Sequence, residues 1–200
     1  MANTADKLFL WIDGVGGYLL CLGNQIAIGQ ATPEAGVDIP VFADISRRHA
    51  TLTRDPEGYL LEAVRSVLVN DRQVDRALLH SGDRVTLGTS CQFLFRQPVA
   101  VSASAVLELV SGHRLRVAVD AVLLMAESLV LGPGPQAHVV VPDLRQPLVL
   151  FRSKDGLGIQ GAGKMLIGGR HYLDRGQIEP GATVSGDDFS LGLEEVSSRQ

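Results

Sequence analysis

The chain has 200 residues, of which 46% are hydrophobic, so its composition allows one or two packed domains. Its formal net charge of -4 argues against non-specific nucleic-acid binding, which usually depends on a basic surface. No apolar run reaches the roughly 18 residues that a membrane-spanning helix needs. Residues 1–7 lack the charged and apolar regions of a signal peptide. We therefore expect a cytoplasmic protein that does not bind membranes.

Short apolar or alternating segments follow one another through the first half, and turn residues separate them. These segments cover residues 8–12, 18–22, 25–28, 50–54, 59–63, 84–87 and 92–95. Asn70-Asp71 stands between 67–69 and 72–74 as the two-residue turn of a hairpin. No window shows a sustained helical period, so the pattern predicts an antiparallel β-sandwich.

A polar cluster, Asp44-Ile45-Ser46-Arg47-Arg48-His49, lies between the extended segment 37–42 and the strand 50–54. It therefore stands on a connecting loop, where binding residues are common. A serine hydroxyl next to guanidinium groups suits the oxygens of a phosphate. The sequence predicts an anion-binding loop at this point.

The two cysteines, Cys21 and Cys91, lie in apolar runs and show no metal-ligand spacing to each other or to the histidines. The sequence therefore predicts two buried thiols. It leaves a disulfide between them open. No cofactor and no metal ion is expected.

Four motifs, in this order over roughly residues 7–97, resemble the forkhead-associated (FHA) family. They are Ile28-Gly29, Ser46-Arg47-Arg48-His49, Val69-Asn70-Asp71 and Ser81-Gly82-Asp83-Arg84-Val85-Thr86-Leu87-Gly88. The resemblance implies a β-sandwich that recognises phosphothreonine in partner proteins. It implies that Ser46 bonds the phosphate, that Arg47 adds charge or holds the peptide backbone, and that His49 ties the loops together. Gly29 and Asn70 would then be structural residues.

Two residues depart from the family's pattern. Gln30 stands where the family has an arginine that binds phosphate, and Arg65 falls where the family has an asparagine that holds the ligand's backbone. A charge-assisted hydrogen bond contributes roughly 1.5–3 kcal/mol, against about 1 kcal/mol for a neutral one. Loss of the arginine could therefore weaken binding about tenfold or more. Arg65, from another strand, or Arg48 could supply the missing charge.

The second half repeats the order of the first. Residues 129–132, 140–151, 167–170 and 180–184 match 26–29, 41–52, 69–72 and 81–85. In this match Arg145, Gln146 and Leu148 replace Ser46, Arg47 and His49, so the anion chemistry is not repeated. The fold class predicted is all-β, with two FHA-like antiparallel β-sandwich domains in tandem. The first covers residues 7–97, the linker 98–103, and the second, degenerate domain 104–197.

Two functions stay open. The chain is either a non-catalytic protein–protein interaction module that reads phosphothreonine in a serine/threonine-kinase substrate, as in signalling, or a phosphate-independent scaffold of the FHA type. An enzyme is not expected, because Ser46 and His49 lack a third orienting group. Exposed edge strands could also form a homo-oligomer, which the sequence does not decide.

Overall fold

The structure, a computed structural model, describes residues 7–99 and 101–196, and its regular elements in these ranges are all β-strands. The predicted all-β fold is therefore confirmed. In the part of the chain that is described, no helix is long and apolar enough to cross a membrane.

The first half contains nine strands. They are β1 (Lys7–Ile12), β2 (Gly16–Cys21), β3 (Gln25–Gln30), β4 (Ile39–Phe42), β5 (Ala50–Asp55), β6 (Gly58–Val69), β7 (Arg72–Leu79), β8 (Arg84–Leu87) and β9 (Cys91–Arg96). The sequence predicts 59–63 and 67–69 as separate strands, because the polar residues between them interrupt the apolar pattern. In the structure both belong to β6, whose pairing with β7 shifts register between Glu62 and Val67.

The second half contains ten strands. They are β10 (Ala105–Leu109), β11 (Arg114–Leu115), β12 (Ala121–Leu124), β13 (Ser128–Gly132), β14 (Val139–Val140), β15 (Leu148–Ser153), β16 (Gly156–Ile167), β17 (Arg170–Ile178), β18 (Thr183–Ser185) and β19 (Ser190–Glu195).

The strand pairings of β3–β9 recur in β13–β19. In the first half β3 pairs with β4 in parallel and with β5 antiparallel, and β6 pairs with β5, β7 and β8. In the second half β13 pairs with β14 in parallel and with β15 antiparallel, and β16 pairs with β15, β17 and β18. The long strands β6 and β16 both carry an irregularity in their pairing with the following strand.

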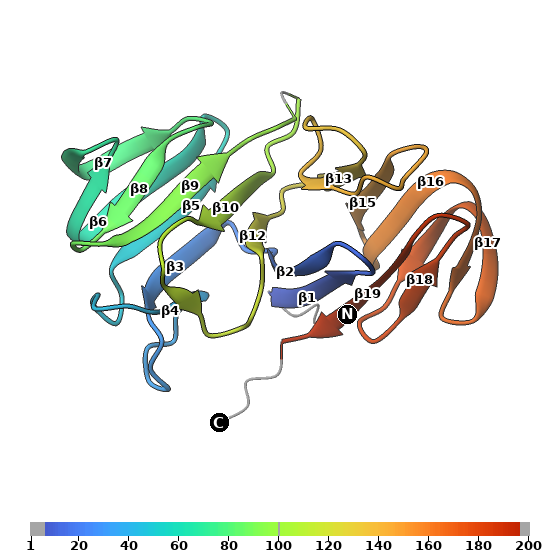
Figure 1. Cartoon of the computed structure of the whole chain (residues 1–200), viewed down its shortest axis with the longest axis horizontal. Helices are drawn as coiled ribbons and strands as arrows, with labels where there is room; N and C mark the ends of the chain where they lie inside the picture. Colours follow the sequence, from blue (N-terminus) through green and yellow to red (C-terminus); the bar gives the residue numbers. More distant parts are fainter. Residues whose placement is uncertain (1–6, 100, 197–200) are drawn as a thin grey trace.

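The first strands of the two halves are exchanged. Strand β1 pairs with β19, the last strand of the second half. Strand β10, which begins the second half, pairs with β9, the last strand of the first half. Each half therefore completes its sheet with strands of the other, and Figure 1 shows β1, β2, β10 and β12 between the two groups of strands.

Strands of the two halves meet in the parallel pair β2–β12. In this pair Leu19 lies beside Val122 and Leu20 beside Leu123. Alternate side chains of a strand point to opposite faces of its sheet. Leu20 and Leu123 accordingly belong to a core that contains mostly second-half residues, whereas Leu19 and Val122 belong to a core of mostly first-half residues. Both faces of this pair are buried, as is usual for parallel strands.

Two side chains strengthen this junction by binding carbonyl groups across it. The hydroxyl of Tyr59, on β6 of the first half, donates to the Leu124 carbonyl at 3.2 Å. Arg152, on β15, donates through Nη2 to the carbonyls of Leu22 and Met125. Because hydrogen bonds satisfy buried carbonyl groups, these contacts hold the ends of β2 and β12 in place.

We expect Leu10→Ala to destabilise the second half. Leu10 is fully buried, lies opposite Leu193 of β19 and packs in the second-half core. Removing such a side chain costs about 2–5 kcal/mol of unfolding free energy. Hydrogen exchange should therefore quicken more in β18–β19 than in β8. Leu107→Ala, at an equally buried site in the first-half core, is the matched control and should show the reverse pattern. Greater exchange in β8 for Leu10→Ala would contradict the exchange of strands.

We expect both thiols to be unreactive in the native protein. Cys21 and Cys91 are free and buried, and burial raises their pKa values to about 12 and about 11. Because the thiolate is the reactive form, titration with Ellman's reagent at pH 8 should detect both thiols only after unfolding in urea. Rapid reaction of one equivalent of thiol in the native protein would contradict this expectation.

Candidate functional site

Three segments of the first half meet around Ser46. They are the end of β3, the loop 43–49 between β4 and β5, and the irregular part of β6. The backbone N–H of Gln30 donates to the Ser46 carbonyl at 3.0 Å. The N–H groups of Val64 and Arg65 donate to the His49 carbonyl at 2.9 and 3.2 Å. The structure thus brings Gln30, Ser46 and Arg65 onto adjoining segments, although they are far apart in the sequence.

His49 connects these segments through its imidazole, which is only 3% exposed. Its Nδ1 accepts the Ser46 N–H at 3.1 Å, and its Nε2 lies 2.9 Å from the Ser66 carbonyl oxygen. Since Nδ1 accepts, the neutral ring carries its proton on Nε2 and donates it to that carbonyl. The Gly88 N–H lies 3.1 Å from both Nε2 and the Ser66 oxygen, and it donates to the oxygen. The His49 side chain therefore ties the Ser46 loop to β6, and the Ser66 carbonyl that it binds also holds the β8–β9 turn. Neither ring nitrogen is directed at the Ser46 hydroxyl.

Gly29 allows the Ser46 loop to lie against β3. A Cβ atom at this position would stand 1.9 Å from the Arg47 carbonyl oxygen and 2.6 Å from its carbon. Both are backbone atoms and cannot rotate away, so any larger residue would push the loop outward. The Gly29 found in the sequence motif is thus explained by close approach of two backbone segments.

The cationic groups of the site lie at its surface. Arg47, Arg48 and Arg65 are exposed, while Ser46 and Gln30 are partly buried. Arg47 faces Glu34 at 3.9 Å, but both side chains are more than two-thirds exposed, so this ion pair is weak. Arg65 donates to the carbonyl of its neighbour Val64 at 3.1 Å. The guanidinium groups therefore remain accessible to an anion.

Asn70 lies away from the Ser46 loop, at the far end of β6. Its Nδ2 donates to Asp83 at 2.7 Å, and its Oδ1 accepts the Arg84 N–H at 3.0 Å. Asn70 and Asp71 have φ values of 50° and 65°, as in a two-residue hairpin turn. The predicted hairpin is present, and the Asn70 side chain ties its turn to the start of β8.

The strand register corrects the sequence match between the two halves at this loop. Ala50 pairs with Ile28, and Leu148 pairs with Leu131 at the equivalent point. Leu148 therefore stands at the position of Ala50, and not at that of His49 as the sequence comparison predicts. The difference arises because the residues between the strands carry no apolar pattern that would fix an alignment.

The corresponding loop of the second half is held by a carboxylate instead of an imidazole. The Arg145 N–H donates to Asp188 Oδ2 at 2.9 Å. A small pocket of about 160 Å³ beside it is lined by Arg145 and Lys164 but also by Asp187 and Asp188. The two carboxylates at this loop would repel an anion such as phosphate.

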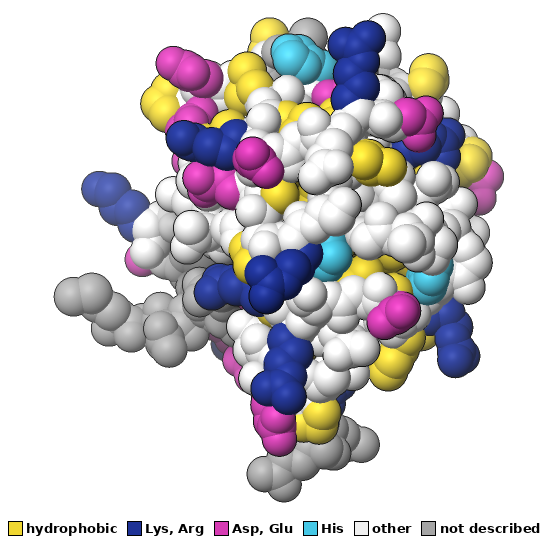
Figure 2. Space-filling view, turned by 90° about the vertical axis from the view of Figure 1, so that its left-hand side faces the viewer, with side chains coloured by type: hydrophobic (Ala, Val, Ile, Leu, Met, Phe, Trp, Pro, Cys, Tyr) yellow, Lys and Arg dark blue, Asp and Glu magenta, His cyan; other side chains and the backbone are white. Residues whose placement is uncertain are grey.

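The sequence reasoning missed a contribution from the second half to the surface beside the Ser46 loop. Strand β11 pairs with β4, so that Arg114 lies opposite Phe42. Arg114-Leu115-Arg116 alternates as an exposed strand does, which is a sequence signal for the strand itself. Nothing in that pattern identifies β4 as its partner. Figure 2 shows the side of the molecule formed by the first-half strands, with Lys and Arg side chains next to a histidine near its middle.

We expect His49→Ala to lower the unfolding free energy by about 1–3 kcal/mol, because it leaves the Ser46 N–H without its partner and weakens the bonding of the Ser66 carbonyl. Urea unfolding would measure the change. His171→Ala, at an exposed histidine of β17, should stay within about 0.5 kcal/mol of the unsubstituted protein. Equal stability of the two variants would show that the His49 contacts do not hold the loops.

A comparison with known protein families matches one part of the chain. Residues 26–88 match the family model described as FHA domain. This segment contains Gly29, the Ser46 loop, His49, Arg65 and Gly88. No curated protein matches the chain significantly.

Several solved structures resemble part of the chain. The NMR-based structure of the FHA-2 domain from the Mycobacterium tuberculosis ABC transporter Rv1747 is 36% identical over 36% of this chain and 66% of that domain, with a TM-score of 0.32. A structure from an analysis of phosphothreonine-dependent FHA domain interactions is 27% identical over 46% of this chain and 96% of that one, with a TM-score of 0.30. The FhaA FHA domain complexed with the intracellular domain of Rv3910 is 24% identical over 40% and 91%, with a TM-score of 0.29. Over residues 26–88, the chain is therefore similar to FHA domains.

Proposed function

We propose that the first half of this chain binds phosphothreonine peptides and acts as a non-catalytic protein–protein interaction module. The observation that carries the proposal is the Ser46-Arg47-Arg48-His49 loop, which the buried His49 holds against β6 within the segment that matches the FHA model. The expected partner is a protein phosphorylated by a serine/threonine kinase.

Each group at the site has a distinct part in binding phosphate. The Ser46 hydroxyl donates one hydrogen bond, and Arg47 supplies charge from the same loop. Gln30 offers an amide donor without charge. Arg65, on β6, and Arg48, on the Ser46 loop, compensate with exposed guanidinium groups. His49 and Gly29 position the loop and do not contact the ligand.

We further propose that the chain is a tandem of two FHA-like units, residues 7–97 and 104–197, joined by 98–103. The recurrence of the strand pairings in β3–β9 and β13–β19 supports this division. Under this proposal each unit lends its first strands to the other. The second unit then serves to complete the first core and does not bind phosphate.

The alternative is a phosphate-independent scaffold, and Gln30 is the observation that favours it. The site lacks the arginine that the family uses at this position, and Arg47 has a carboxylate neighbour in Glu34. Under this alternative the loops bind a partner through their surface, and a phosphate adds nothing to the affinity.

A phosphothreonine peptide library, tested beside its unphosphorylated counterpart, distinguishes the two functions. We expect phosphate-dependent binding that Arg47→Ala weakens about tenfold or more, because a charge-assisted hydrogen bond contributes roughly 1.5–3 kcal/mol. Gln30→Arg should strengthen binding to a similar extent. Arg145→Ala, in the corresponding loop of the second half, is the matched control and should leave binding unchanged. Equal binding of both libraries would establish the scaffold.

A further inference from the structure

His138, directly before β14, is a buried histidine that plays no part in the proposed binding site. It is only 2% exposed. Its backbone N–H donates to the Val130 carbonyl, and its ring Nδ1 accepts the Val130 N–H, both at 2.9 Å. Because Nδ1 accepts, the neutral ring carries its proton on Nε2. Nε2 is buried and makes no hydrogen bond with the described residues. The site therefore suits the neutral imidazole.

The start of β10 is held beside this ring. Ser104 is fully buried, and its hydroxyl donates to the Ser128 carbonyl at 2.6 Å and accepts the Ala126 N–H at 2.8 Å. The Ser104 backbone lies close enough to the imidazole to influence the pKa of His138. Strand β10 continues from Ser104 to pair with β9 of the first half. His138 thus stands where the second half holds a strand that completes the first.

The first half has a carboxylate at the corresponding position. Ile28 pairs with Ile39 as Leu131 pairs with Val139, so Asp38 corresponds to His138. Its backbone N–H donates to the Ala27 carbonyl at 2.9 Å, and its Oδ2 accepts the Ala27 N–H at 2.8 Å. Its Oδ1 lies 3.4 Å from Lys7 Nζ, so the charge has a partner. A carboxylate with an ordinary pKa near 4 stays ionised from pH 5 to 8, whereas an imidazole titrates in this range.

The surroundings of His138 oppose a positive charge. Burial lowers its pKa, the backbone groups of Ser104 and Val130 oppose this shift, and the charge of Arg96 adds to it. Arg96, on β9, is itself bound to Glu108 of β10, with Nε and Oε1 2.8 Å apart. Strands β13 and β14 and the linker 98–103 contain no titratable side chain.

Strand β15, the antiparallel neighbour of β13, contributes one further cation. This is Arg152, which donates to the carbonyls of Leu22 and Met125. The charged side chains that these elements bring to the junction are therefore two arginines and the carboxylate that binds one of them.

We propose that His138 is a pH-sensitive switch at this junction, and that protonation of its ring loosens the hold of the second half on the start of β10. Both nitrogens of an imidazolium carry protons. The Nδ1 proton then faces the Val130 N–H, so this hydrogen bond is lost while a positive charge is placed in a buried site. The switch is independent of the proposed phosphopeptide function.

The direction of the effect follows from the two protonation states. In an opened junction the histidine has its ordinary pKa near 6.5, and in the closed junction its pKa is lower. The opened state therefore binds more protons below about pH 6.5. The equilibrium constant for opening rises as the pH falls, by up to about tenfold per pH unit, and above about pH 7.5 it no longer changes.

The test is amide hydrogen exchange at Val130, measured by NMR at pH 7.5 and 5.5 and corrected for the intrinsic exchange rate. We expect protection in the unsubstituted protein to fall about tenfold at the lower pH. In His138→Asn, Oδ1 replaces Nδ1 as the acceptor and does not titrate, so protection should be equal at both pH values. His171→Asn, at an exposed histidine of β17, is the matched control and should keep the tenfold loss. His49 is present in all three proteins, so its contribution cancels.

Equal protection of Val130 at both pH values in the unsubstituted protein, or a loss that persists in His138→Asn, would overturn the proposal. The ring resonances of His138 give a second readout that needs no variant. We expect the ring to stay neutral, with its proton on Nε2, until the pH at which Val130 loses protection. A ring that becomes charged while the Val130 amide stays protected would show that protonation does not open the junction.

Discussion

The parallel pair β2–β12 is the contact on which the rest of the structure depends. It joins strands that begin different halves of the chain, and its side chains alternate between the two cores. Each core therefore includes strands from the other half, because β1 pairs with β19 and β10 pairs with β9. Burial of apolar surface is the main driving force of folding, and here much of it is obtained only when both halves are folded together. Each half therefore depends on strands of the other to complete its core.

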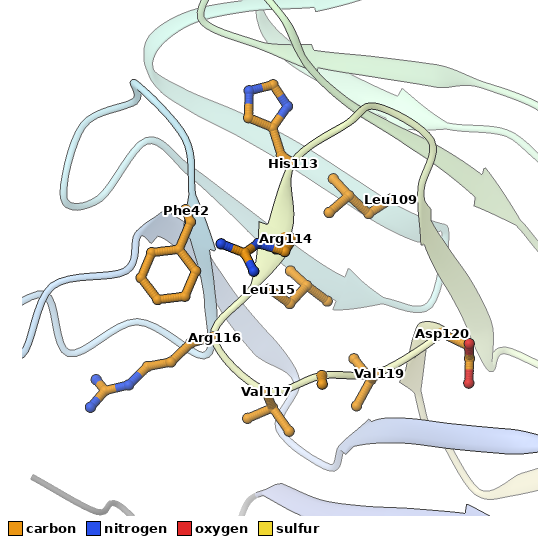
Figure 3. A pocket seen from close by; sticks show the side chains of 10 residues that line it. Phe42, Leu109, His113, Arg114, Leu115, Arg116, Val117, Val119 and Asp120 are labelled. Atoms are coloured by element: carbon orange, nitrogen blue, oxygen red, sulfur yellow. The ribbon is translucent and has the colours of Figure 1, made fainter.

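The exchange also shapes the candidate binding surface. Because β10 and β12 are anchored on first-half strands, the segment between them crosses over the first half and places β11 on the edge of β4. An exposed strand edge is a liability, and β11 covers this one. The same crossing brings Arg114 beside Phe42 (Figure 3), next to the loop that contains Ser46.

His49 and Asp188 hold corresponding loops of the two halves through different chemical groups. Both residues hold a loop by accepting a backbone N–H, at Ser46 and Arg145 respectively. The neutral imidazole does so without adding negative charge, whereas the carboxylate introduces the charge that a phosphate avoids. The strand pairings thus recur in the second half, but the residues of this loop do not, which agrees with the general rule that function belongs to sites and not to folds.

Local pattern in the sequence was enough to predict most strands, the Asn70–Asp71 hairpin and the buried thiols, because alternation, turn residues and apolar runs depend on near neighbours. The sequence alone missed the continuity of β6, since Val64-Arg65-Ser66 interrupts its apolar pattern. Its match of Leu148 with His49 differs by one residue from the strand register, which puts Leu148 level with Ala50. The exchange of strands was decided only by the tertiary structure. Strands β1 and β10 are both apolar, so the sequence of each is compatible with pairing to either β9 or β19. Which pairing forms depends on how the strands pack around the two cores. The position of β11 on β4, and with it the pairing of Arg114 with Phe42, follows from that choice.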